Sequence, residues 1–297
     1  MKKERFEKQE LAATKLSEYL AGKLDRKVGY PDLPTWGYAF SALFFNGFSD
    51  KKEMAELSIR LLSMQHHENK EYSWEFVTFA IKLLSNRGEV KIPENFLQYR
   101  EKGTRMFNWF LLRCHNKLVY DKENKFVWVK LRIALVLYQT KEGLILDEFK
   151  TRSLHYHAFC LFVIAHILKE NKSDWLKESF VKGVEFALRY IMDDGTSLFI
   201  GRGQEQIFGY GSLLYSLEYC NKEIKKIDEN LLEKVSSKIL NNQRCDGSFP
   251  LVLRVSNPEP ENINYRQDKP CGWHGYNTLY DYLPFLGYCL SETSKLK

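Results

Sequence analysis

The chain has 297 residues, 44% hydrophobic and 14% aromatic, which is enough for a sizeable core and excludes a disordered chain. Its 44 Lys and Arg against 38 Asp and Glu give a net charge of +6 that is spread along the sequence. No basic cluster interleaved with aromatic residues and no apolar run of transmembrane length is present, so neither nucleic acid nor membrane insertion is expected.

The N-terminal segment, residues 1–24, is charged and amphipathic, without the apolar centre and cleavage site of a signal peptide. A cytoplasmic location is therefore the default expectation. The cysteines form no CxxC pair and most lie in apolar helical patterns, so we expect buried free thiols and no disulfide framework. They are Cys114, Cys160, Cys220, Cys245, Cys271 and Cys289.

Apolar residues recur at helical spacing along the chain, and strand-like alternation is nearly absent. The pattern predicts helices over residues 4–21, 37–47, 51–65, 73–86, 94–114, 127–139, 154–170, 173–191, 204–220, 228–241 and 275–291. Short loops join them, and no joint before residue 256 resembles an interdomain linker. We therefore expect a single domain over residues 1–297, built from helical hairpins that bury their apolar faces against one another.

Two turns indicate how these hairpins are arranged. Asp194-Gly195 and Asp246-Gly247 are 52 residues apart, which is the length of two helices with their loops. The segment QRCDGSF, residues 243–249, is similar to the helix-connecting turns of α/α-toroid proteins. The sequence therefore predicts an all-α fold, an (α/α) toroid that is either incomplete or has six hairpins.

Polar and aromatic residues gather at four predicted helix starts, and in a toroid such ends share one cleft. The first cluster, EYSWEF at 71–76, offers Tyr72, Trp74 and Glu75, either as core residues or as a platform for a sugar. Trp36, near the start of an earlier helix, is a further candidate for stacking on a sugar.

The second cluster is TRSLHYHAF at 151–159, where Arg152 precedes the pair Tyr156 and His157. On a helix His155 and His157 lie about 200° apart, so they cannot hold one metal ion together. We expect no metal and no other cofactor. A tyrosine beside a histidine at a helix start suits proton transfer, although a single histidine can equally be structural.

The third cluster, GRGQEQIFGYG at 201–211, places four glycines among Arg202, Gln204, Glu205 and Tyr210. One interpretation is a helix cap with a local ion pair between Arg202 and Glu205. The other is a ligand site, in which the arginine and the helix N-terminus hold a carboxylate or sugar hydroxyls and the glycines admit the ligand.

The fourth cluster, CGWHGYNTLYDYLPF at 271–285, places Trp273, His274, Tyr276 and Asn277 ahead of the last helix. It fits either the wall of a cleft or a packed closure of the ring.

Together these four segments and the two turns resemble the α/α-toroid domain of heparinase II/III-like and alginate-lyase-like polysaccharide lyases, over about residues 30–290. The resemblance implies an acidic, uronate-containing polysaccharide as substrate and β-elimination as reaction. It implies Arg202 or Gln204 as neutraliser, His157 or Tyr156 as base, and Tyr210 or His274 as acid. The remaining cluster residues would bind the substrate: Trp36, Tyr72, Trp74, Glu75, Arg152, Glu205, Trp273, Tyr276 and Asn277.

Two features differ from what these lyases usually carry. Tyr156-His157 stands where an Asn-His or similar pair is usual, and we expect no C-terminal β-domain of the kind that commonly follows the toroid within these 297 residues. Two alternatives stay open. A toroid glycoside hydrolase would use two carboxylates from among Glu75, Asp194 and Glu205. A non-catalytic protein would bind carbohydrate in the same cleft.

Overall fold

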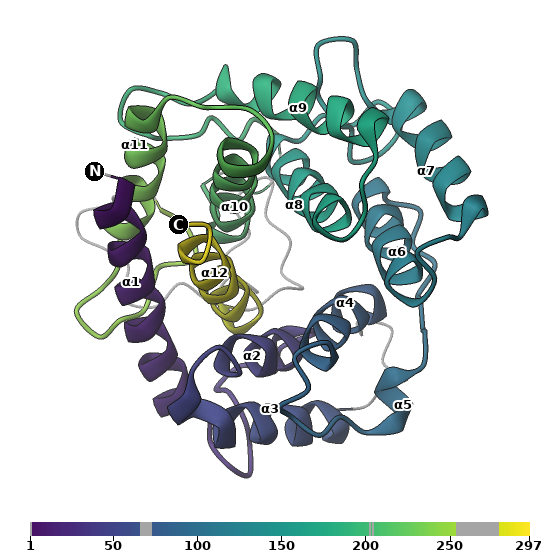
Figure 1. The fold of residues 1–297 in the computed structure, drawn as a ribbon. Coiled ribbons are helices and arrows are strands. Elements are labelled where there is room, and N and C mark those ends of the chain that lie inside the picture. The colour runs from purple at the N-terminus through teal and green to yellow at the C-terminus, as the bar shows by residue number, and fades with distance from the viewer. Residues whose placement is uncertain (1, 66–72, 202, 204, 254–278) are drawn as a thin grey trace.

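The computed structural model describes residues 2–65, 73–201, 203, 205–253 and 279–297, and in this part of the chain the helices form two concentric layers (Figure 1). Six of them make the inner layer: α2 (Gly37–Phe45), α4 (Trp74–Ser85), α6 (Phe107–Tyr120), α8 (Leu154–Glu170), α10 (Ile207–Glu223) and α12 (Leu279–Ser294).

The outer layer surrounds them. It consists of α1 (Lys2–Lys23), α3 (Lys52–Met64) with the short η1 (Ser49–Lys51) before it, α5 (Glu94–Leu97), α7 (Lys125–Tyr138), α9 (Asp174–Leu188) and α11 (Glu229–Leu240). Each outer helix is followed along the chain by an inner one, and α1 lies beside α12 and α11, which closes the ring. The predicted (α/α) toroid is confirmed, and the described helices make six hairpins.

The two layers differ in the pattern of their apolar residues. All nine residues of α2 are buried, and α8 is buried on every side along most of its length. In the outer helix α11 only Leu232, Val235, Ser236 and Ile239 are buried, the single stripe of an amphipathic helix. Inner helices therefore pack on all sides, whereas an outer helix contacts the ring through one face.

A repeated turn fixes the spacing of the hairpins. Glycines 143, 195 and 247, at intervals of 52 residues, all have positive φ angles, between 84° and 112°. A Cβ atom on any of them would lie within 2.2–2.5 Å of a backbone oxygen in the next outer helix: Lys182 of α9, Lys234 of α11 and Lys15 of α1, respectively. Only glycine permits this approach, and the third turn joins the end of the ring to its beginning.

The predicted helix over residues 94–114 is wrong. The chain instead forms α5 and α6 with an extended connection between them, which contains Gly103 at a φ of 74°. The buried carboxylate of Glu75 accepts hydrogen bonds from the amides of Lys102 and Gly103, at 3.1 and 3.2 Å, and so holds this connection open. A contact distant in sequence overrides the local helical pattern.

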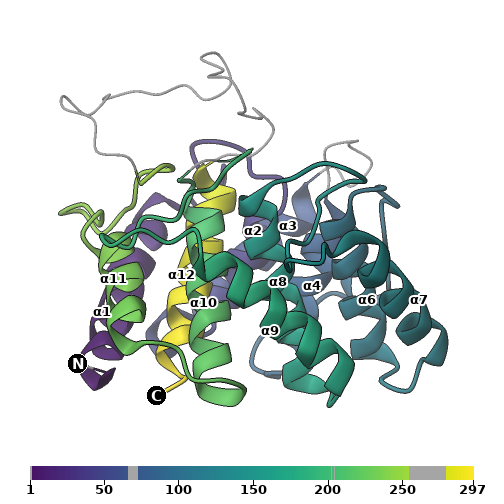
Figure 2. The same cartoon turned by 90° about the horizontal axis from the view of Figure 1, so that it is seen from above.

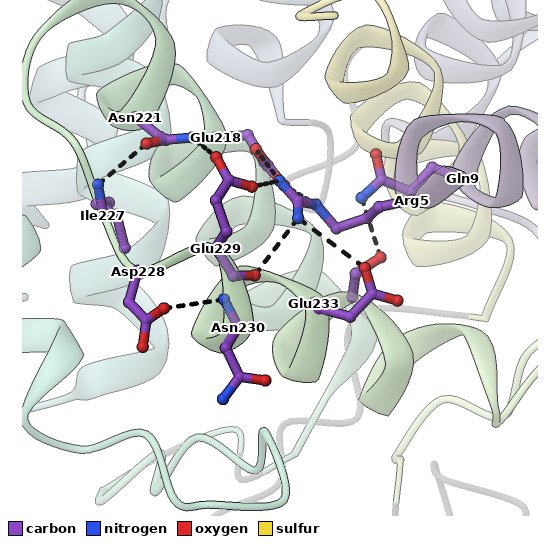
Figure 3. A network of polar contacts seen from close by, with 10 residues as sticks. Arg5, Gln9, Glu218, Asn221, Ile227, Asp228, Glu229, Asn230 and Glu233 are labelled. Atoms are coloured by element: carbon purple, nitrogen blue, oxygen red, sulfur yellow. Dashed lines mark hydrogen bonds and ion pairs between the residues drawn. The ribbon is translucent and has the colours of Figure 1, made fainter. Parts of the chain in front are cut away.

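An ion cluster around a buried arginine joins the first helix to α10 and α11 (Figure 3). The fully buried guanidinium of Arg5 in α1 lies 2.7 Å from Glu218 of α10 and 2.8 Å from Glu229 of α11. Beside it, Gln9 donates to Ser236 at 3.0 Å. The ring is thus closed by ionic contacts as well as by apolar packing.

No helix in the described ranges is long and apolar enough to cross a membrane. Five cysteines fall in these ranges and all are free thiols, with Cys114, Cys160, Cys220 and Cys289 buried and Cys245 exposed.

Candidate functional site

A pocket of about 280 Å³ is lined by residues at or near the starts of the inner helices. These helix starts lie on the face of the ring opposite the two chain termini (Figure 2). Each inner helix, or the residues directly before it, contributes to the lining. Its lining residues are Thr35 and Trp36 before α2, Ser73 and Phe76 at α4, Asn108 and Trp109 of α6, Tyr156 of α8, Phe208 of α10 and Tyr282 of α12, with Lys102, Thr104, Met106 and Asp147 from the connections.

The N-terminal ends of the inner helices carry partial positive charge because their first N–H groups have no partner within the helix. Several such ends around one pocket favour an anionic or hydroxyl-rich ligand. The side-chain ammonium of Lys102 adds a full positive charge to the lining.

A carboxylate is fixed within this lining. Asp147 is only 1% exposed, and its side chain accepts a hydrogen bond of 2.5 Å from the amide nitrogen of Asn108. Its backbone oxygen accepts from the amide of Phe107 at 2.8 Å, so side chain and main chain both fasten Asp147 to the start of α6. Asp147 and Asn108 therefore form a rigid polar pair in the pocket.

The orientation of Asn108 leaves one acceptor unused. Because its Nδ2 donates to Asp147, its Oδ1 is the remaining polar atom, and this buried oxygen has no hydrogen-bond partner among the described residues. Buried acceptors are seldom left unsatisfied in folded proteins. An O–H or N–H group of a ligand would satisfy it.

Aromatic rings form the other walls. Trp36 is 2% exposed, stacks on Phe76 with ring centroids 5.0 Å apart, and also contacts Phe208 and Tyr282. It therefore forms the floor of the pocket and does not present an open face. Trp109 is only partly buried and meets Phe76 edge-on at 5.3 Å, so it is the lining tryptophan better suited to stack on a sugar ring.

Two buried carboxylates bind the backbone next to the pocket. Glu75 accepts from the Lys102 and Gly103 amides and pairs with Arg113 at 3.1 Å, which positions the connection that carries Lys102 and Thr104. Asp281 accepts from the backbone amides of Thr35, Trp36 and Gly37, at 2.7–3.2 Å, and so caps α2. Both carboxylates order the backbone around the site.

The structure places two of the residues proposed from sequence in the pocket lining, Trp36 and Tyr156. All four clusters contribute at least one lining residue: Ser73, Tyr156, Phe208 and Tyr282. Residues 271–278 of the fourth cluster lie outside the described residues.

His157 has a structural position. It is fully buried, its Nδ1 accepts from the Ile145 amide and its Nε2 donates to the Gly183 oxygen, both at 3.0 Å. Burial lowers the pKa of this histidine to about 4. Neither ring nitrogen faces the pocket, so the role of base that the resemblance implies for His157 does not fit its surroundings.

Tyr210 also lies away from the pocket. Its buried hydroxyl accepts a hydrogen bond of 3.1 Å from the Ser197 amide, and burial raises its pKa. A phenol held in this way inside the ring is not placed to protonate a leaving group in the pocket.

Other sequence candidates lie outside the lining as well. Trp74 is half-buried under the guanidinium of Arg100, 4.6 Å from the ring centroid. Arg152 is exposed on the surface, and the half-buried Glu205 joins Leu253 through its backbone oxygen at 2.8 Å. Asp194, a carboxylate considered for hydrolysis, is exposed and holds its own turn through Thr196.

The glycines of the third cluster serve packing. A Cβ atom on Gly203 or Gly209 would lie 2.8 or 2.6 Å from the ring of His155, and one on Gly201 would lie 2.6 Å from the backbone oxygen of Arg152. They let α10 and its preceding turn approach α8. Packing thus accounts for three of the four glycines without a ligand. Seven candidates lie outside the described residues: Tyr72, Arg202, Gln204, Trp273, His274, Tyr276 and Asn277.

Asn108, Asp147, Lys102 and Trp109 were missed from the sequence. Asn108 follows directly on the start of α6, and Asp147 lies seven positions before α8, so the rule that polar residues gather at inner helix starts applies to both. The wrong helix over 94–114 hid this signal, because it placed Asn108 and Trp109 in a helix interior.

In the described ranges no group of three or more His, Cys, Asp or Glu side chains is arranged to hold a metal ion.

No family model and no curated protein matches the sequence, but solved structures share the fold. A polysaccharide lyase superposes with a TM-score of 0.62 at 11% identity, over 97% of this chain and 98% of that one. A GH76A α-1,6-mannanase from Salegentibacter gives 0.65 at 10% identity, over 97% and 100%. A type II terpene cyclase from Scytonema gives 0.59 at 12% identity, over 98% and 100%. These similarities establish the toroid fold. They do not identify the reaction, which must be argued from the residues of the pocket.

Proposed function

We propose that the protein is a carbohydrate-active enzyme that cleaves an acidic, uronate-containing polysaccharide at the pocket by β-elimination. The observation that carries the proposal is that Lys102 and Asp147 from the connections meet Asn108 and Tyr156 of the inner helices beside the partly buried Trp109. Aromatic walls with a few convergent polar groups are typical of sugar sites.

β-Elimination requires three catalytic groups from the protein: a cation, a base and an acid. A cationic group stabilises the negative charge that develops when the proton at C5 of the uronate is removed. A base takes that proton, the C4–O bond breaks as the C4–C5 double bond forms, and an acid returns a proton to the leaving oxygen.

In this pocket the Lys102 ammonium and the helix N-termini would face the uronate carboxylate. Tyr156 would transfer the protons, and Asn108, held by Asp147, would accept a hydroxyl of the same sugar at its unused oxygen. Arg202 and His274 keep the roles that the resemblance implies for them, as predictions.

Hydrolysis is the second candidate, because Asp147 supplies a buried carboxylate and a mannanase shares the fold. Glycosidases generally need two carboxylates flanking the bond. Among the described lining residues Asp147 is the one carboxylate, which favours elimination.

The products separate the two reactions. Incubation with a panel of uronate-containing polysaccharides should yield unsaturated uronyl ends, which absorb in the ultraviolet. Saturated reducing ends would establish hydrolysis instead, and an intact chain across the panel would favour a binding protein.

Tyr156→Phe tests the residue assigned to proton transfer. We expect kcat to fall about a hundredfold or more, the scale of a lost general acid or base, with the free energy of unfolding little changed. Tyr190→Phe is the matched control, because Tyr190 is also half-buried but lies outside the pocket lining. A Tyr156→Phe variant as fast as the control would remove Tyr156 from the mechanism.

A further inference from the structure

Helix α7 exposes an unusual amount of apolar surface. Five of its large apolar side chains are more than half exposed: Phe126 68%, Val129 55%, Ile133 57%, Val136 76% and Leu137 61%. Its inward side is apolar too, with Val127, Leu131 and Leu135 buried against the ring. A helix that is apolar on both sides is normally covered on both.

The exposed side chains form one continuous stripe. At 100° per residue they fall within an arc of about 100°, and they extend about 17 Å along the helix. Figure 1 shows α7 at the outer edge of the ring, and Figure 2 shows it at the same edge from another direction. The stripe therefore lies on the outer edge of the ring.

Cations border the stripe on both sides. Lys125 and Arg132 are exposed and fall at one edge of the arc, and the exposed Lys130 falls at the other, with its Nζ 4.2 Å from the ring centroid of Phe126. The sequence of α7 contains no Asp or Glu. An apolar stripe with cations at both edges suits a partner with an apolar interior and an anionic surface.

We propose that α7 lies on the surface of an anionic lipid membrane, with its apolar stripe among the upper acyl chains and its cations at the headgroup phosphates. A convex helix enters a bilayer interface without needing a matching groove, and anionic headgroups attract flanking lysine and arginine side chains. A second copy of the chain fits less well, because a two-fold contact through this stripe would bring cations against cations. The contact is peripheral and requires no membrane-spanning helix.

Vesicle co-sedimentation of the full chain tests the proposal, with phosphatidylcholine vesicles and with vesicles that also contain phosphatidylglycerol. We expect binding to the anionic vesicles and much weaker binding to the neutral ones, with the bound fraction falling as salt is raised. Val136→Glu should weaken binding about tenfold or more, because it places a carboxylate in the apolar stripe.

Val28→Glu is the matched control, since Val28 is 77% exposed, almost the same as Val136, but lies outside α7. It should bind as the unchanged protein does, apart from the general effect of one added negative charge. Equal losses in the two variants, or no binding to anionic vesicles at low salt, would overturn the proposal. Reversible dimerisation abolished by Val136→Glu, without vesicle binding, would also overturn it and identify a second copy as the occupant.

Discussion

The imidazole of His157 is enclosed between the Ile145 amide and the Gly183 oxygen, and burial lowers its pKa to about 4, whereas an unfolded histidine titrates near a pH of about 6.5. The unfolded chain therefore binds a proton at a higher pH than the folded chain does. The contribution of neutral His157 to stability is complete above about pH 6.5 and is lost as the pH falls toward 4.

His157→Gln should make the protein less sensitive to acid. Between about pH 6 and pH 4 the free energy of unfolding should fall less steeply in the variant, by about 1.4 kcal/mol per pH unit, because one proton-binding group is gone from the unfolded chain. Urea unfolding at a series of pH values measures this slope. Identical slopes in the two proteins would mean that His157 is not held neutral by the fold.

Asn108 and Asp147 show what sequence could not reveal about single residues. Each is an ordinary polar residue in the sequence, and their importance comes from the 2.5 Å hydrogen bond that joins α6 to the connection before α8. Tyr156 and Trp36, which line the pocket, were candidates from the sequence because they lie at predicted helix starts. The position of a residue on a helix was predictable, but the pairing of residues from different hairpins was not.

Among the elements, periodicity predicted most helices because each must bury an apolar face. It failed over residues 94–114, where the Glu75 carboxylate holds an extended connection through the amides of Lys102 and Gly103. Periodicity also did not show which polar helix starts belong to inner helices, and therefore lie near the pocket, and which belong to outer helices. The glycine turn at Gly143 has no preceding Asp in the sequence. It is recognised only when the spacing of 52 residues is counted back from Gly195.

Glu75→Gln separates a positioning role from the hydrolytic role considered for this residue. If Glu75 orders the connection that carries Lys102, the variant should lose about 1–3 kcal/mol of stability, and its KM should rise. If Glu75 were a carboxylate of a glycosidase, kcat would fall at least about a hundredfold at nearly unchanged stability. Glu53→Gln, at an exposed ion pair with Arg26, is the control and should alter neither quantity much.

At the scale of the whole molecule, the ring must be closed between its first helix and its last hairpin. Arg5 does this with a guanidinium that is fully buried against Glu218 and Glu229 (Figure 3). The pairing of Arg5 with a residue more than two hundred positions away could not be read from the sequence. The toroid was predicted from the recurring DG turns and from the similarity of residues 243–249 to toroid turns, but whether the ring is complete was left open.

Arg5→Ala should cost about 3–5 kcal/mol of stability, because it leaves the buried carboxylate of Glu218 without its cation. Arg26→Ala, which removes an exposed ion pair with Glu53, should cost about 1 kcal/mol or less. Thermal and urea unfolding of both variants provide the measurement. Equal, small losses would show that apolar packing alone closes the ring.

The central claim is that the pocket at the starts of the inner helices binds the acidic sugar. Calorimetric titration of a uronate oligosaccharide into the unchanged protein and into Lys102→Met tests it most directly, because the Lys102 side chain lines the pocket while its backbone amide still bonds to Glu75. The Kd for the oligosaccharide should rise about tenfold or more in the variant, as expected when a charge-assisted contact is lost. Equal affinity of the two proteins for the oligosaccharide would contradict the claim.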